Sequence, residues 1–476
     1  MKRLSLAAAL LLVTTSAPSL AQTRSISASD KAQGAQANPE LLKQFGGAYQ
    51  GPQSAYVERV GRKVAVQSGL SNAGADFTVA LLNSPVENAF AIPGGYIYVT
   101  RQLLALMNSE AELASVMGHE VGHVAARHSD ARAKRSAFGS IFAGVVGAVA
   151  GNGMIGNLLG AASRTGAQLY TLKYGRDQEY QADGLGVRYI TAAGYDPYAA
   201  ASMLTQLNTE TTLQSRIAGR NANAVPAWAS THPNGADRIA RARALAQATG
   251  RAPAPGAQDV AFLRMLDGLA YDDDPAEGVI DGQTFRHKAL RVRFAAPAGY
   301  TIDNGADVVT VSGNGGQAQF RVAASSSDLA GFTATQMQAL GISSANEPQA
   351  GIANGVRYVA QTGRAMASNR QVDATIVAYA FPSATYWFVL VTPAGQGAGP
   401  FGSLVSSVAP LSVSEAAAIR GKRIAIVTVK AGDTIDTLAA RMAYTSFQRD
   451  RFVALNGLAA NARLAPGTLV KVVVAG

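Results

Sequence analysis

The sequence predicts an α+β protein. Apolar residues recur at helical spacing in residues 109–124, and a second helical stretch, which includes residues 174–183, ends at Gly194 before Asp196-Pro197. Short runs rich in β-forming residues stand at 77–82 and 96–100, and more of them alternate with glycine-rich turns across 259–411. With 476 residues, of which 48% are hydrophobic, the chain is long enough for about three domains with real cores.

The first helix carries the most informative motif of the chain. Ser109 followed by Glu112 is a capping-box start, and the pentapeptide His-Glu-Val-Gly-His occupies 119–123. His119 and His123 stand four residues apart, so both imidazoles can reach one metal ion, while Glu120 points toward a water on that metal. Zinc lowers the pKa of such a water from about 15.7 to about 7, and a carboxylate can take its proton. The motif predicts metal-assisted amide hydrolysis; an amphipathic helix with two surface histidines is the alternative.

A catalytic zinc needs a third protein ligand, and the second helix offers one. Glu179 and Asp183 are four residues apart and share a face, so we assign Glu179 to the metal. Asp183 is then placed to accept the distal ring N–H of a zinc-bound histidine. A solvated acidic face is the alternative, and Asp177 is a competing ligand.

These motifs together resemble a known group of enzymes. The segment Asn-Ala-Phe-Ala-Ile-Pro-Gly-Gly at 88–95, the pentapeptide, the Glu-x-x-x-Asp element and Thr-His-Pro at 231–233 resemble gluzincin zinc metallopeptidases of the CAAX prenyl protease, HtpX and BepA type. The resemblance covers roughly residues 39–250. It implies a mainly helical, zincin-like catalytic domain with a small sheet, one zinc per chain, and endopeptidase activity on bacterial envelope proteins. Because no membrane span flanks the motifs, the periplasmic branch is the closer likeness.

His232 stands in a loop just before a predicted helix. The resemblance places it near the metal, where it either polarises the scissile carbonyl or occupies the open position of the zinc and silences the enzyme. The alternative is a histidine in a surface turn. Arg238 on the following helix is a weaker candidate for oxyanion stabilisation, and His128 is predicted to be structural.

Residues 88–92 are predicted to form an edge strand beside the metal. A substrate peptide can add to such a strand by backbone hydrogen bonds, so Asn88, Ala89, Phe90 and Ala91 are candidate substrate-binding residues. An edge strand without any ligand is the alternative.

The N-terminus reads as a signal peptide. Lys2 and Arg3 precede an apolar run at 4–13 and a small-residue cleavage site at 19–21, so residues 1–21 are expected to be removed, and 22–250 form the peptidase domain. The run is shorter than the about 20 residues that span a bilayer. We expect a periplasmic or secreted protein.

The net charge is +10, but the lysines and arginines are scattered, so the sequence does not favour nucleic acid as a partner. Anionic envelope surfaces are the more natural partners of this charge. The Gly- and Ala-rich apolar segment 137–163 is broken at 151–153. It is predicted to be a lid over the cleft or a peripheral membrane contact, with plain core packing as the alternative.

Two further units follow a Pro-, Gly- and Ala-rich linker at 248–258. Residues 259–411 are predicted to form an α+β accessory domain without a metal or nucleophile constellation, with a central strand at 385–391. Residues 424–476 resemble a LysM domain in their Gly-Asp-Thr turn, Asn-Gly-Leu motif and closing Pro-Gly segment. The resemblance implies a βααβ fold and peptidoglycan binding; a degenerate module that only packs on its neighbour is the alternative.

The sequence thus predicts an exported zinc endopeptidase acting on unfolded or misassembled envelope proteins. A peptidoglycan-tethered chaperone or assembly factor with a largely silenced site is the second hypothesis, and a peptidoglycan hydrolase is the third.

Overall fold

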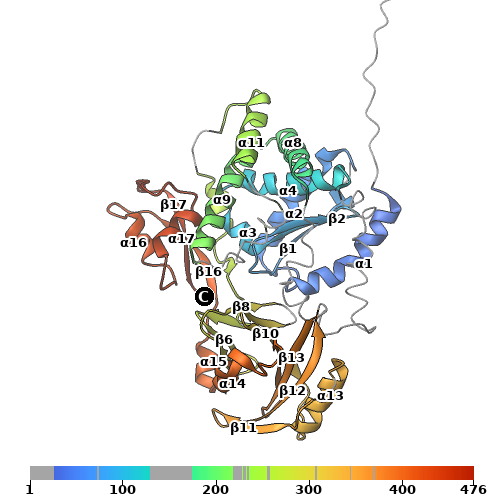
Figure 1. Cartoon of the computed structure of the whole chain (residues 1–476). Coiled ribbons are helices and arrows are strands. Elements are labelled where there is room, and N and C mark those ends of the chain that lie inside the picture. Colours follow the sequence, from blue (N-terminus) through green and yellow to red (C-terminus); the bar gives the residue numbers. More distant parts are fainter. Residues whose placement is uncertain are drawn as a thin grey trace, which may run out of the picture.

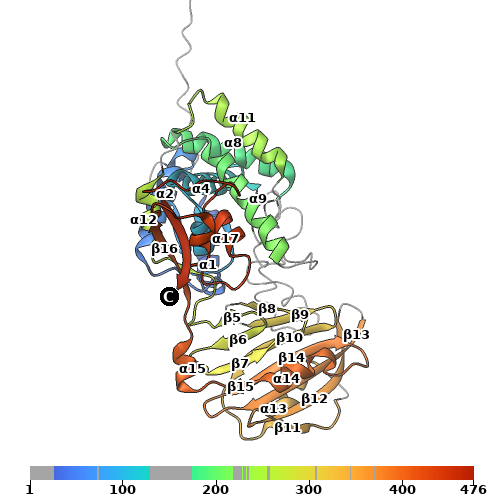
Figure 2. The same cartoon turned by 90° about the vertical axis from the view of Figure 1, so that its left-hand side faces the viewer.

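The computed structural model describes residues 26–71, 74–128, 174–217, 228, 232, 235–254, 258–305, 308–342, 345–367 and 370–476. The expected signal peptide at 1–21 and the apolar segment 137–163 lie outside the described residues. Two views at right angles place the accessory sheets at the end of the molecule away from α8 and α11 (Figures 1 and 2). None of the described helices is both long and apolar enough to cross a membrane.

The first unit packs helices around a three-stranded sheet of order β1-β3-β2. Its elements are α1 (Ala28–Gln44), α2 (Pro52–Ala65), β1 (Thr78–Leu82), β2 (Ala89–Ile92), β3 (Tyr96–Thr100), α3 (Arg101–Leu106), α4 (Glu110–Ala125), α8 (Arg176–Ala192), α9 (Ala199–Ile217) and α11 (Ala236–Ala248). β1 runs parallel to β3, with Leu82 opposite Thr100, and β2 runs antiparallel to β3. The predicted strands are present, and β2 is at the edge of this sheet, as expected.

Helix α4 begins where the sequence predicts, with a small change in its cap. The Ser109 hydroxyl accepts a hydrogen bond from the Glu112 backbone N–H at 3.2 Å. The Glu112 carboxylate reaches one residue further back than a standard capping box, and accepts from the backbone N–H of Asn108 at 2.7 Å. Every residue from Glu112 to His123 is buried, so α4 is a core helix rather than a surface helix.

The accessory unit is a seven-stranded antiparallel sheet of order β11-β12-β13-β14-β10-β9-β8 beside a four-stranded sheet of order β15-β7-β6-β5. The elements are β5 (Val279–Asp281), β6 (Thr284–His287), β7 (Val292–Ala295), β8 (Thr301–Asn304), β9 (Val309–Gly313), β10 (Gly316–Ala323), α13 (Leu329–Ala339), β11 (Gln349–Ala353), β12 (Val356–Ala367), β13 (Arg370–Ala380), β14 (Thr385–Pro393), α14 (Gly402–Ser407), β15 (Ala409–Pro410) and α15 (Val413–Ala418). One face of the large sheet packs on β6, β7 and α14, and the other packs on α13. β14 is central, as predicted.

The accessory unit starts later than the expected boundary at Asp259. α12 (Val260–Met265) and β4 (Ala270–Tyr271) place Phe262, Leu266 and Tyr271 in the core that contains helices α2 and α4 of the first unit. β4 pairs with the C-terminal strand β16 instead of an accessory strand. Residues 259–271 thus pack with the first unit, and the strands of the accessory sheets begin at β5.

The C-terminal module has the order strand, helix, helix, strand: β16 (Lys422–Thr428), α16 (Ile435–Ala439), α17 (Gln448–Leu455) and β17 (Leu469–Ala475), with the two strands antiparallel. Its apolar side chains belong to the same core as the helices of the first unit, and α17 packs on α9 (Figure 2). The Lys471 ammonium is fully buried and donates hydrogen bonds to the carbonyls of Ala105 and Met107, both at 2.7 Å. Burial lowers the pKa of Lys471 to about 7. The module thus shares one core with the first unit.

Candidate active site

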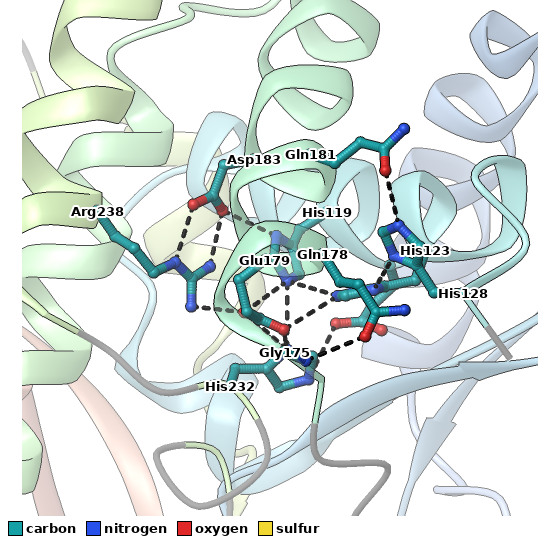
Figure 3. A network of polar contacts seen from close by, with 11 residues as sticks. His119, His123, His128, Gly175, Gln178, Glu179, Gln181, Asp183, His232 and Arg238 are labelled. Carbon is teal, nitrogen blue, oxygen red and sulfur yellow. Dashed lines mark hydrogen bonds and ion pairs between the residues drawn. The ribbon is translucent and has the colours of Figure 1, made fainter. Parts of the chain in front are cut away.

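Four side chains meet between α4, α8 and the segment that precedes α11 (Figure 3). They are His119 and His123 from α4, Glu179 from α8, and His232. All four are buried, and one ligand atom from each lies within 4.8 Å of the others. Among the described residues, this is the group of histidines and carboxylates whose geometry suits a metal ion.

Glycines allow the two ligand helices to approach closely. A Cβ atom on Gly118 would lie 3.1 Å from the Gly186 carbonyl oxygen, and one on Gly122 would lie 3.0 Å from the Ala182 carbonyl oxygen. A Cβ atom on Gly186 would lie 3.0 Å from the backbone nitrogen of His119. The backbones of α4 and α8 therefore touch at the level of the motif, which carries the Glu179 carboxylate to the two imidazoles.

We expect Gly186→Val to push α8 away from His119. Overpacking of a closed helix contact typically costs about 1–3 kcal/mol, so the thermal unfolding midpoint and the metal affinity should both fall. Gly184→Val on the same helix is the matched control, because a Cβ atom on Gly184 meets nothing within 4 Å. Calorimetry and metal titration of the two variants check this, and equal behaviour of both would mean that the close approach is not needed.

His119 is held by Asp183. Its Nδ1 donates to the Asp183 carboxylate at 2.9 Å, which directs the Nε2 lone pair of the neutral ring toward the cluster. Burial raises the pKa of Asp183, but hydrogen bonds from Arg238 and His119 outweigh burial and hold that pKa at about 2. Burial likewise lowers the pKa of His119, but its hydrogen bonds with Asp183 and Glu179 raise it to about 9. The two carboxylates thus favour a positive charge beside the His119 ring, which is either a proton on Nε2 or a cation bound by the Nε2 lone pair.

His123 is held by a second chain of contacts. The Gln181 side-chain oxygen lies 3.0 Å from Nε2 of His128, and Nδ1 of His128 lies 2.9 Å from Nδ1 of His123 (Figure 3). If Gln181 accepts, His128 must accept in turn at Nδ1, so His123 donates there and keeps its Nε2 lone pair for the cluster. Burial lowers the pKa of His123 well below its ordinary value, which favours the neutral ring. Tyr174 stacks on the same ring with centroids 3.6 Å apart.

The residues fit a divalent cation. Nε2 of His119 and Nε2 of His123 are 3.0 Å apart, and the Glu179 carboxylate oxygens lie 3.5 Å and 3.4 Å from them. Two lone pairs and a carboxylate that face one point repel one another unless a positive charge lies between them. Burial would raise the pKa of Glu179, but the nearby histidines hold it far below its usual range. Two imidazoles with one carboxylate are a donor set that zinc binds.

Glu120 has no hydrogen-bond partner among the described residues. Both of its carboxylate oxygens are buried, and burial raises its pKa. The nearest ring nitrogen is Nε2 of His232, 3.6 Å from Oε1. A buried carboxylate without a partner is costly in a purely structural role, so it is a candidate for chemistry.

His232 lies among the predicted ligands. Its Nδ1 is 3.2 Å from Nε2 of His119 and 3.1 Å from a Glu179 oxygen, distances like those between the other three ligands. The ring stacks on Trp228, with centroids 4.3 Å apart and the planes 24° from parallel. His232 is only 1% exposed. In this conformation it stands where a fourth donor would stand.

Other predicted residues fall in different places. Asp177 is exposed and outside the cluster. Arg238 was expected to be a weak candidate for oxyanion stabilisation, but its guanidinium is bound to the carboxylates of Asp183 and Glu179. His128 is not in the ligand group, yet it contacts His123 directly.

Nothing in the local pattern indicated Tyr174, Trp228 or Gln181, which reach the site through the tertiary fold. Two neighbouring acids in a buried site need a positive charge beside them. This requirement could have predicted that Arg238 pairs with Asp183 and Glu179.

The expected substrate-binding strand is next to α4. Phe90 fills the core, with its ring 4.9 Å from the ring of Tyr98, so only the backbone of this residue is suited to pairing with a peptide. Asn88 is fully buried, and neither its side-chain nitrogen nor its side-chain oxygen has a partner among the described residues. Ala89 and Ala91 are buried in the core.

Known proteins share the segment that contains this site. Residues 52–246 match the family described as Peptidase family M48. The mitochondrial metalloendopeptidase OMA1 of Arabidopsis thaliana is 32% identical over 37% of this chain and 32% of its own length. The OMA1 enzyme of Schizosaccharomyces pombe is 31% identical over 40% of this chain and 51% of its length. The beta-barrel assembly-enhancing protease of Escherichia coli is 31% identical over 40% of this chain and 38% of its length.

The match thus spans about a third to a half of these curated relatives. Among solved structures, cyanobacterial PsbP from Synechocystis has a TM-score of 0.22 at 15% identity, over 28% of this chain and 98% of that chain. The cluster of His119, His123, Glu179 and His232 lies entirely within residues 52–246, the segment that is similar to Peptidase family M48.

Proposed function

We propose that the chain is a zinc-dependent endopeptidase, exported to the cell envelope, that hydrolyses peptide bonds of unfolded or misassembled envelope proteins. The observation that supports this most strongly is the cluster of His119, His123 and Glu179 beside an unpartnered Glu120, within a segment that matches Peptidase family M48. We assign one zinc per chain to the three ligands, and general-base catalysis to Glu120.

Zinc in this site would supply Lewis acidity, which makes water nucleophilic at neutral pH and polarises the peptide carbonyl. The chain supplies the rest. Glu120 takes a proton from the attacking water and delivers it to the leaving nitrogen, because its carboxylate is buried and has no competing hydrogen bond. Asp183 and His128 keep His119 and His123 in the orientation that presents Nε2.

Substrate binding is proposed at β2. A peptide added to this edge would pair with the backbone of Ala89, Phe90 and Ala91, which selects extended or unfolded segments with little dependence on side chains. The unpartnered amide of Asn88 at the start of the strand is a second contact for a peptide backbone. The likeness to enzymes of the CAAX prenyl protease and HtpX type belongs to this proposal.

The cellular setting is proposed from the sequence and from relatives. The signal-peptide pattern predicted at residues 1–21 is the basis for proposing export to the periplasm or beyond, and one relative is by name a beta-barrel assembly-enhancing protease. The βααβ order of the C-terminal module supports the LysM likeness. Because the module shares its core with the peptidase, we propose that it is a fixed part of the enzyme; peptidoglycan binding by it and membrane contact by residues 137–163 stay predictions.

A second function is favoured by the position of His232. With this ring among the ligands, the site is closed in the present conformation, which suits a peptidoglycan-tethered chaperone or assembly factor whose hydrolysis is mostly silenced. Hydrolysis of peptidoglycan is the third hypothesis.

Cleavage of an unfolded protein before and after metal removal tests the proposal. We expect cleavage by the purified chain, its loss after dialysis against a chelator, and its return with a stoichiometric amount of zinc. Cleavage that survives complete metal removal would contradict the zinc enzyme, and release of fragments from purified sacculi would favour the third hypothesis.

A further inference from the structure

We propose that Arg238 is the positioning residue of the metal centre: one guanidinium holds the ligand Glu179 and the supporting acid Asp183 in register, and so sets metal affinity. The inference rests on the proposed zinc site and goes beyond it by assigning a function to a residue outside the ligand set.

The guanidinium of Arg238 makes two hydrogen bonds to Asp183 and a third contact with Glu179. Nε donates to Oδ2 of Asp183 at 2.8 Å and Nη2 donates to Oδ1 at 2.7 Å. Nη1 lies 2.7 Å from Oε2 of Glu179 (Figure 3). Such fork geometry is specific to arginine, because a lysine ammonium offers only a point charge.

Both ends of this network reach the metal ligands. Asp183 Oδ1, which accepts from Arg238, also accepts from Nδ1 of His119 at 2.9 Å. The guanidinium is thus in contact with a proposed ligand, Glu179, and one hydrogen bond removed from another, His119. A shift of Arg238 would rotate a carboxylate and release an imidazole together.

The charges require such a residue. Glu179 and Asp183 are 1% and 7% exposed, so their repulsion is poorly screened by water. Together with a dication, the guanidinium balances the charges of Glu120, Glu179 and Asp183. Arg238 is itself 3% exposed, so its guanidinium meets both acids away from bulk water.

Arg238 also determines where α11 meets α8. It lies in the first turn of α11, which begins after Gly235, and α11 packs on α8 and α9. A merely structural role would be to fasten these helices. Arg241 offers a matched control, because it lies on the same helix, is exposed, and reaches α8 only through the Tyr180 ring at 5.0 Å.

The test compares Arg238→Met, Arg238→Lys and Arg241→Met in the full chain. Zinc affinity is measured by competition with a chromophoric chelator, ligand geometry by the absorption spectrum of the cobalt-substituted protein, and folding by the thermal midpoint of the metal-free protein. We expect zinc affinity to fall about 10- to 100-fold in Arg238→Met, with a changed cobalt spectrum and a smaller fall in Arg238→Lys, while Arg241→Met matches the parent.

A double variant separates positioning from helix fastening. If Arg238 acts through Asp183, Asp183→Asn combined with Arg238→Met should weaken zinc binding no further than the stronger single change. If Arg238→Met does not fold, Arg238→Lys and Asp183→Asn carry the comparison. Unchanged zinc affinity and cobalt spectrum in a folded Arg238 variant, with only a lower thermal midpoint, would overturn the inference and leave the peptidase standing; failure of the parent chain to bind zinc would end both.

Discussion

Glu120→Gln is expected to lower the rate of peptide hydrolysis by about 100- to 10,000-fold, the usual contribution of a general base. The substitution keeps the size of the side chain and removes only its ability to take a proton. Because neither carboxylate oxygen of Glu120 has a hydrogen-bond partner among the described residues, no hydrogen bond seen there is broken, and the free energy of unfolding should not fall. Zinc content and binding of an unfolded protein should therefore match the parent chain.

Two comparisons make this result specific. Glu58→Gln changes a surface acid that pairs with Arg62, and it should leave turnover unchanged. Glu179→Gln should remove both zinc and activity, because it weakens a proposed ligand. A Glu120→Gln protein that still cleaves at the parent rate would remove Glu120 from the mechanism, and a parent chain that binds unfolded protein without cleaving it would favour the chaperone hypothesis.

His232→Ala is expected to raise cleavage by about 10-fold or more. The ring stands among the ligands, so substrate has access only in the minority of molecules in which His232 has moved away. Minor conformations of this kind typically make up about 0.1–10% of a population, and removing the ring makes the open form dominant. Steady-state cleavage of an unfolded protein, corrected for the folded fraction, measures the change.

The opposite outcome has an equally clear meaning. If His232→Ala destroys activity while zinc stays bound, the ring polarises the scissile carbonyl and the closed conformation is only a resting geometry. The gain should disappear in the double variant Glu120→Gln with His232→Ala, which shows that any new activity comes from this site. An unchanged rate in His232→Ala would exclude both roles.

The ligand cluster was accessible from sequence because its spacing is local. The interval of four residues puts His119 beside His123 on any helix, and the same interval links Glu179 to Asp183. Helix α4 was predictable from apolar spacing, and the strands of the accessory unit from β-rich runs between glycines, because both patterns report burial along one element.

Features of the site that depend on contacts between distant elements could not be predicted from the sequence. Arg238 comes 55 residues after Asp183, and only the packing of α11 on α8 brings them together. The closeness of α4 and α8 depends on Gly118, Gly122 and Gly186, whose role is visible only when both helices are placed.

The C-terminal module shows the same limit at a larger scale. Its strand and helix order follows from local motifs, whereas the insertion of Lys471 beneath α3 and the pairing of β16 with β4 follow from tertiary packing alone. Residues just after the expected boundary at Asp259, such as Phe262, pack in the core that the first unit shares with the C-terminal module.

The central claim is that side chains from α4 and α8 hold a single zinc. Metal analysis of the purified chain, combined with anomalous diffraction at the zinc absorption edge, tests it most directly. We predict one zinc per chain, bound by Nε2 of His119, Nε2 of His123 and the carboxylate of Glu179. A chain purified without metal that also takes up none, or a metal that Glu179 does not touch, would contradict the account.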